Sequence, residues 1–313
     1  MVTDATLAGA DPLSAFLEQV RRSLIDQRAA MDDALNKWSA AAPPECQLAL
    51  DAGYLKSPQQ DRTAQRRLYH NGWRAAFMTA TSVGDHVCAM ADSASADAPR
   101  SFAHMTLARA ALEGAGRINY LLCPGGTVQD RVLRAAALMV ASAEEELLAV
   151  AEFAGWNVEL QRAADASARR KHGEVMALVR TAGIQATAGR GGRTLSLRWP
   201  DAESVISVSM NVTDVLRRLL PTRPAAYRVG SGAAHSQPWV LDDDEAFNPQ
   251  TNRLTWSLDP AALAGSADLG ITACALTLDA FGALLGADPS GERLHAHERE
   301  QAMSIRVRPL LQA

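Results

Sequence analysis

Cysteine is scarce in this chain, and its spacing excludes two common ways of holding a protein together. The cysteines are scattered through 313 residues with no C-x-x-C pair among them: Cys46, Cys88, Cys123 and Cys274. Disulfide frameworks and structural zinc sites need paired or closely spaced cysteines. The hydrophobic content of 48% is instead ample for a sizeable core. Unpaired cysteines also fit the reducing environment of the cytoplasm.

An excess of positive charge is also missing. The formal net charge is -4 and the sequence pI is about 6.0. A protein that coats nucleic acid or an anionic membrane has a broadly basic surface, so any such contact must be local here. Lysine occurs only at Lys37, Lys56 and Lys171, and arginine therefore supplies nearly all of the positive charge.

Neither a leader peptide nor a membrane span is expected. Residues 1–11 contain no basic region followed by an apolar run. The longest apolar stretch, residues 269–278, lies between Asp268 and Asp279 and is too short to cross a bilayer. The sequence thus predicts a soluble, cytoplasmic protein.

Long amphipathic helices are the dominant pattern. Apolar residues recur at steps of three and four, and Pro43-Pro44 and the Cys123-Pro124-Gly125-Gly126 run break the pattern. Helices of this length with short breaks usually pack as an antiparallel bundle. The expected helices cover residues 12–40, 61–92, 99–122, 127–154, 157–181, 201–220, 261–285 and 291–307, with a further one that contains Tyr227 and ends at Pro238.

Two short segments alternate apolar and polar residues, as strands do. One contains Leu195, Leu197 and Trp199, and the other contains Leu254, Trp256 and Leu258. Because a lone short strand leaves its backbone groups unpaired, we expect the two to form a ribbon with each other. The predicted fold class is therefore mostly α: a helical bundle with a minor two-stranded β ribbon.

The chain is expected to divide by position rather than by repeats or linkers. Residues 1–60 would form an N-terminal helix and loop, and residues 61–238 a central helical bundle. Residues 239–313 would add a β segment and C-terminal helices packed on the same domain. No internal repeat or long low-complexity linker interrupts this order.

The helix around residues 227–235 carries the strongest candidate site. At about 100° per residue, Tyr227, Arg228, Ser231 and His235 fall within an arc of roughly 100°. The opposite side has Val229 with glycine and alanine only, so it can lie close against a neighbour. Glycine inside a helix costs up to about 1 kcal/mol relative to alanine, which suggests that another helix approaches here, such as a second copy across a dimer axis.

Arginine and histidine on one face suit phosphodiester chemistry. A guanidinium holds a phosphate bidentately, and an imidazole moves protons near neutral pH. Together they could cleave RNA through its own 2′-hydroxyl, without a metal or a cofactor. The alternative is an amphipathic helix whose polar side simply faces water.

The Arg228-x6-His235 spacing resembles the Arg-x4-to-6-His signature of the HEPN superfamily, helical bundles that include metal-independent ribonucleases of toxin and phage-defence systems. The Tyr227-x3-Ser231-x3-His235 spacing is similar to a motif in a related family of bacterial helical proteins. That family also carries an earlier Leu-x-Arg-x3-Glu pattern, matched here by Leu107, Arg109 and Glu113.

The resemblance implies an endoribonuclease in which Tyr227, Arg228, Ser231 and His235 are catalytic. Arg109 and Glu113 would line the same cleft and bind substrate; from the residues alone they are equally an i,i+4 pair on a solvated stripe. The implied partners are RNA or a nucleotide, a second copy in a homodimer, and a protein such as an antitoxin.

Active HEPN ribonucleases commonly have a polar residue after the arginine, where this chain has Val229. That difference favours the alternative function, a non-catalytic binding or assembly module.

Other polar groups give weaker signals. Arg190 and Arg193 lie in a glycine-rich loop that offers backbone amides and charge to a phosphate, although no P-loop Gly-Lys-Ser/Thr follows. His295 and His297 diverge by about 200° on a helix, which disfavours a shared metal ion. The acidic run 242–245 is interpreted as an exposed turn and the Asp85-His86 pair as a surface feature or a satisfied core histidine, and no metal site is predicted.

Overall fold

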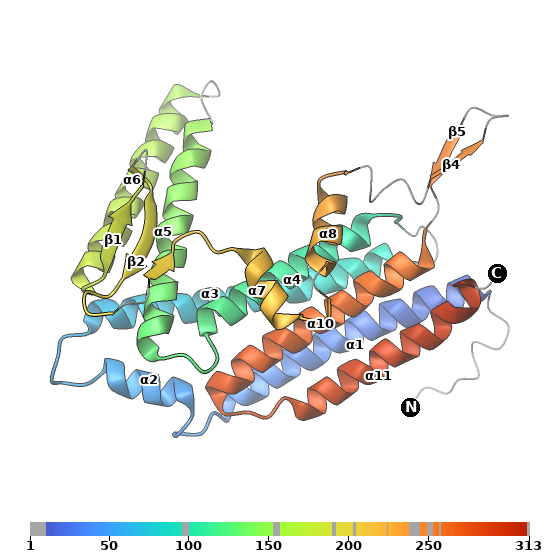
Figure 1. Ribbon diagram of the computed structural model, residues 1–313, viewed down its shortest axis with the longest axis horizontal. Helices are drawn as coiled ribbons and strands as arrows, with labels where there is room; N and C mark the ends of the chain where they lie inside the picture. The colour runs from blue at the N-terminus through green and yellow to red at the C-terminus, as the bar shows by residue number, and fades with distance from the viewer. Residues whose placement is uncertain are drawn as a thin grey trace. The chain divides into compact units, whose positions relative to one another are not determined.

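The computed structural model describes residues 11–95, 100–152, 157–189, 192–202, 205–223, 225–237, 245–248, 253–256 and 258–311, which are mostly helical (Figure 1). The predicted helical bundle character is confirmed. The helices are α1 (Pro12–Ala40), α2 (Gln47–Leu55), α3 (Thr63–Ser93), α4 (Ala103–Leu122), α5 (Val128–Glu152), α6 (Val158–Thr181), α7 (Val212–Leu219), α8 (Ala226–Ala234), α10 (Pro260–Leu285), α11 (Ser290–Val307) and the short 3₁₀ helix η4 (Arg308–Leu311).

Polar side chains cap several helices at or close to the residues where those helices were expected to begin. The Asp11 carboxylate accepts a hydrogen bond from the backbone N–H of Ser14 at the start of α1, and the Asn157 side chain accepts two at the start of α6. The carboxylate of Asp259 does the same for α10. Each cap satisfies backbone donors that a helix start leaves open, which fixes where the helix begins. At its other end α10 stops at Gly286, whose positive φ of 69° suits glycine.

The predicted β ribbon is wrong, because its two segments pair with other strands. β2 (Thr194–Arg198) lies between β1 (Gln185–Ala188) and β3 (Val205–Ser207) in a three-stranded antiparallel sheet. β5 (Arg253–Trp256) pairs with β4 (Glu245–Asn248). Each strand thus pairs with its neighbour along the chain, where the loop to be closed is short.

Two further segments differ from the sequence prediction. The helix expected over 201–220 is reduced to α7, because β3 occupies 205–207. α2 was not predicted: it is a nine-residue helix in a stretch expected to be loop. Its buried face contains Asp51 beside Leu55, so a charge interrupts the apolar pattern that would have indicated a helix.

Residue contacts divide the chain into two compact units. Unit 1 comprises Met1–Ala42, Met78–Asn119 and Val212–Ala313, and unit 2 comprises Pro43–Phe77 and Tyr120–Asn211. α3 and α4 contribute residues to both. The division by residue range at 60 and 238 stays a prediction.

Each unit has its own core. In unit 1, α1, α10 and α11 pack side by side (Figure 1), with Phe16, Leu24 and Phe281 fully buried. In unit 2, α5 and α6 pack together, and Leu197 of β2 joins their core with Val140. α10 is long and apolar enough to cross a membrane by length and composition, but 61% of its most apolar window is buried in the protein, as expected for a core helix.

Candidate functional site

The short helix α8 lies against α4 in unit 1 (Figure 1), and Gly230 packs directly on α4. A Cβ atom at this position would lie 2.8 Å from the Cβ of Arg109 and 3.1 Å from the carbonyl oxygen of Met105. Side-chain atoms do not come that close to a neighbour, so the packing requires glycine here. The predicted close approach of another helix is confirmed at Gly230, and that helix is α4 of the same chain rather than a second copy.

This contact joins two motifs that are far apart in the sequence. The Arg109 Nη2 donates to the Tyr227 hydroxyl at 3.3 Å, and that hydroxyl donates to Glu113 Oε2 at 3.5 Å. The Arg109 guanidinium carbon also lies 5.3 Å from the centroid of the Tyr227 ring, within range of a cation–π interaction. We call Arg109, Glu113, Arg117 and Tyr227 the α4–α8 cluster.

Glu113 is the single carboxylate of this cluster. It pairs with Arg117 at 3.2 Å and with Arg109 at 3.7 Å. The expected i,i+4 pair of Arg109 and Glu113 is therefore present, and a second arginine shares the same carboxylate. Two guanidinium groups on one carboxylate leave the cluster with a net positive charge, and among the described residues the Arg109 Nε has no hydrogen-bond acceptor.

Arg228 and His235 lie on the solvent side of α8. Both are exposed, and Ser231 is half-buried between them. His235 is the C-cap residue, so α8 ends one residue before it. Within the described ranges, neither side chain forms a hydrogen bond or an ion pair. Both groups are thus available to an external ligand, next to the cluster that holds Tyr227.

A surface groove of about 430 Å³ continues from the cluster between α3 and α4. Arg228 and His235 are not among its lining residues, which are Met78, Thr79, Ser82, His86, Ala110, Glu113, Gly114 and Arg117. α3 and α4 come close here because Gly114 faces Val83, whose Cγ2 would lie 2.6 Å from an added Cβ. The sequence analysis did not select Ser82 and His86. Their i,i+4 spacing was the available signal, and Ser82 Oγ lies 3.4 Å from His86 Nε2.

The other candidates lie elsewhere. Arg190 is outside the described residues, as are residues 242–244. Arg193 belongs to unit 2, where its guanidinium pairs with Glu145 at 2.6 Å and Glu144 at 3.5 Å, and its role in substrate binding stays a prediction.

His295 and His297 pair separately along α11, with Glu298 at 3.1 Å and Glu300 at 3.7 Å. In the part of the chain that the structure describes, no three His, Cys, Asp or Glu side chains gather as they would around a metal ion.

Comparisons with protein-family models, with curated proteins and with solved structures found no match. The HEPN resemblance therefore depends on the two short sequence motifs alone.

Proposed function

We propose that the protein is a cytoplasmic, HEPN-like endoribonuclease that needs no metal, with its active site on the solvent side of α8. The observation that carries the proposal is that Arg228 and His235 are both exposed on the solvent side of α8. In the part of the chain that the structure describes, neither side chain has a hydrogen-bond or ion-pair partner. The arginines of the α4–α8 cluster already share Glu113. Arg228 is therefore better placed to take a new anionic partner, and a phosphodiester fits its fork of donors.

The proposed reaction is an internal transesterification of RNA. The 2′-oxygen attacks phosphorus, the bond from phosphorus to the 5′-oxygen breaks, and the products end in a 2′,3′-cyclic phosphate and a 5′-hydroxyl. One proton leaves the 2′-hydroxyl and another reaches the departing 5′-oxygen. His235 transfers one of these protons, and Arg228 stabilises the charge that builds up on the phosphoryl oxygens.

The α4–α8 cluster would position this helix rather than react. Tyr227 precedes Arg228 directly, and its ring and hydroxyl are held by Arg109 and Glu113. Contacts that hold Tyr227 would fix the first turn of α8, the segment that carries Arg228. Arg117 and His86 line the groove beside this cluster, where Arg117 already pairs with Glu113 and His86 contacts Ser82.

Cleavage of RNA in the presence of EDTA tests the proposal. Purified protein should cut RNA under these conditions, and Arg228→Ala and His235→Ala should each lower the rate by about 10² or more, as expected for electrostatic or acid–base roles. Arg228→Lys should restore only part of the activity, because lysine lacks the bidentate fork. Arg180→Ala on α6 and His295→Ala on α11 replace exposed residues of the same types and should retain the wild-type rate. If the protein cuts no RNA in the presence of EDTA, the proposal that it is a ribonuclease is rejected.

A second candidate function is a binding module that recognises RNA or a nucleotide without cutting it. It is favoured by Val229, which is 40% exposed next to Arg228 where active HEPN enzymes commonly have a polar group. This candidate predicts salt-sensitive RNA binding that Arg228→Ala weakens, with no cleavage product.

We also propose that the protein forms a homodimer through the exposed side of α8, which would bring two copies of His235 to one RNA strand. Since Gly230 packs within the chain, the dimer contact would involve Val229 rather than Gly230. A monomer in sedimentation at micromolar concentration would contradict this assembly.

A further inference from the structure

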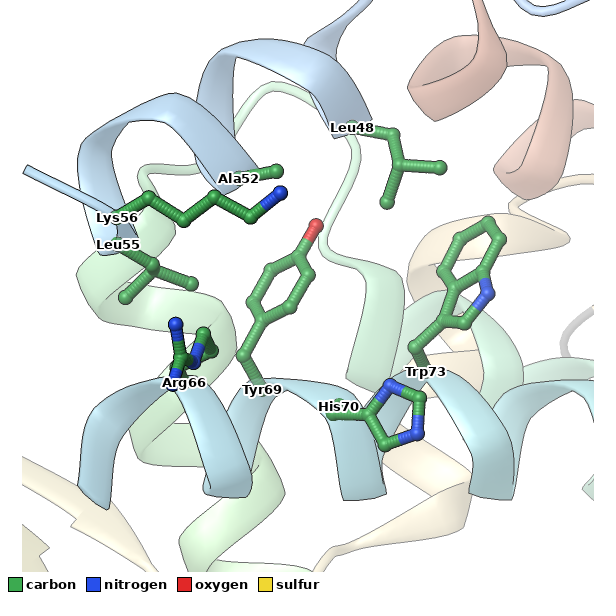
Figure 2. Close-up of a pocket in the computed structure, with 8 residues that line it drawn as sticks. All are labelled: Leu48, Ala52, Leu55, Lys56, Arg66, Tyr69, His70 and Trp73. Carbon is green, nitrogen blue, oxygen red and sulfur yellow. The ribbon is translucent and has the colours of Figure 1, made fainter. Parts of the chain in front are cut away.

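Unit 2 contains a separate cavity between α2 and α3, with a volume of about 240 Å³ (Figure 2). The Tyr69 ring stands between the two helices, with Leu48 and Trp73 on one side and Leu55 on the other. The walls are almost entirely carbon. The lining residues are Leu48, Ala52, Leu55, Lys56, Arg66, Tyr69, His70 and Trp73.

A buried ion pair holds α2, which forms one wall of this cavity, against α5. Asp51 of α2 accepts two hydrogen bonds from Arg131 of α5, at 2.7 and 2.8 Å, and both side chains are only 2% exposed. Arg131 also donates to the carbonyl oxygens of Cys123 and Gly126. α2 is thereby held in place before any ligand binds.

The same carboxylate orients the Tyr69 ring. The Tyr69 hydroxyl donates to Asp51 Oδ2 at 2.8 Å. Burial, followed by the charge of Asp51, raises the pKa of this hydroxyl, so it stays protonated and keeps donating. Because the Tyr69 hydroxyl is already hydrogen-bonded to Asp51, Tyr69 offers the flat face of its ring to the cavity.

The rim of the cavity is basic. Lys56, Arg66 and His70 reach it from α3 and the end of α2, and Arg66 and His70 also line an adjoining recess of about 410 Å³ together with Arg67 and Asn71. Across the described ranges, none of the three rim side chains has an ion-pair partner.

Among the described residues, Asp61 is a carboxylate whose charge interacts with Arg66, and its hydrogen bonds come from Thr63 at the start of α3. Hydrogen bonds from the backbone N–H and hydroxyl of Thr63 lower the pKa of Asp61, and the charge of Arg66 contributes less. The positive charge of Lys56 and Arg66 is thus largely uncompensated.

We propose that this cavity binds a small aryl anion, with its ring against Tyr69 and Trp73 and its carboxylate or phosphate at Lys56, Arg66 and His70. Aromatic walls favour a flat ring, and guanidinium and ammonium groups favour an anionic substituent. The volume is just below the range of about 300–1,000 Å³ for sites of drug-sized ligands, which limits the ligand to one ring system with a short charged arm. The proposal is independent of the ribonuclease site.

Titration with 2-naphthoate, 2-naphthyl phosphate and the neutral 2-naphthamide tests this site. We expect saturable binding of at least one anion, about tenfold tighter than the amide, with shifts of the Trp73 indole N–H signal in NMR spectra. Whichever anion binds more tightly identifies the charged group. Arg66→Gln should weaken anion binding about tenfold and leave amide binding unchanged, because it removes one charge-assisted contact.

Arg74→Gln is the matched control, since Arg74 is an exposed arginine of α3 that does not line the cavity. Ala52→Phe should fill the cavity and abolish binding of all three compounds. The proposal is overturned if neither anion saturates by about 10 mM, if anion and amide bind equally, or if Arg66→Gln behaves like Arg74→Gln.

Discussion

At the scale of single residues, the site is organised by Tyr227 and Gly230 as much as by the groups proposed to react. Tyr227 connects Arg109 and Glu113 to α8, and Gly230 makes the helix contact close enough for that connection. The sequence indicated each motif separately through helical spacing. The resemblance implied that Arg109 and Glu113 would line the same cleft as the α8 residues. Their direct contact with Tyr227 could not be predicted, because it joins residues more than a hundred positions apart and depends on how α8 packs on α4.

Replacement of Gly230 by alanine tests this contact. Helix propensity alone would make Gly230→Ala stabilising by up to about 1 kcal/mol, but overlap with Arg109 and Met105 should make it destabilising by about 1–3 kcal/mol. Amide hydrogen exchange across residues 226–234 should accelerate, and RNA cleavage should fall.

The control for this substitution is Gly265→Ala, at an exposed glycine of α10 with no neighbouring atoms within 4 Å of an added Cβ. It should stabilise the protein by about 0.4–1 kcal/mol in urea unfolding. If Gly230→Ala stabilised the protein as much as Gly265→Ala does, the close packing of α8 on α4 at Gly230 would be contradicted.

At the scale of elements, periodicity was a reliable guide to long helices and a poor one to short segments. α1 begins and ends as predicted, because many apolar residues define its buried face and Asp11 caps it. α6 begins one residue later than predicted, because Asn157 is its N-cap. β1 has four exposed residues and β3 has three residues in all, so neither shows an apolar alternation. α2 was not predicted because it is only nine residues long and has the charged Asp51 on its buried face.

Breaking that ion pair should therefore be costly. Asp51→Asn leaves Arg131 buried without its carboxylate and should destabilise unit 2 by about 3–5 kcal/mol. The exposed pair of Asp165 and Arg169 on α6 is the matched control, and Asp165→Asn should cost about 0–1 kcal/mol. Urea unfolding followed by circular dichroism measures both. Similar losses for the two variants would show that the buried pair does not anchor α2.

At the scale of the whole molecule, Glu300 is a carboxylate whose shifted pKa links stability to pH. Glu300 of α11 faces Asp268 of α10, with Arg223 and His297 nearby. Burial, reinforced by the charge and hydrogen bonding of Asp268, raises the pKa of Glu300 to about 7. The folded protein thus keeps a proton on Glu300 that the unfolded chain has lost above about pH 4.5.

This shift predicts a fall in stability as pH rises. The contribution of protonated Glu300 is fully present below about pH 4.5 and is lost as pH rises through about 7. Glu300→Gln stays neutral, so its free energy of unfolding relative to wild type should increase from pH 5 to pH 8. Gln59→Ala, at an exposed side chain that does not titrate, should show no such trend. A constant difference between Glu300→Gln and wild type would contradict the shift.

The identity of the ends produced from RNA tests the central claim most directly. The same oligonucleotide sequence is incubated with the protein in EDTA as RNA and as DNA, and the products are analysed by mass spectrometry. Cleavage that uses the 2′-hydroxyl predicts RNA products with 2′,3′-cyclic phosphate and 5′-hydroxyl ends, intact DNA, and a loss of about 10² or more in rate for His235→Ala. Cleavage of the DNA, RNA products with 5′-phosphate ends, or equal rates for His235→Ala and wild type would contradict the assignment of this chemistry to α8.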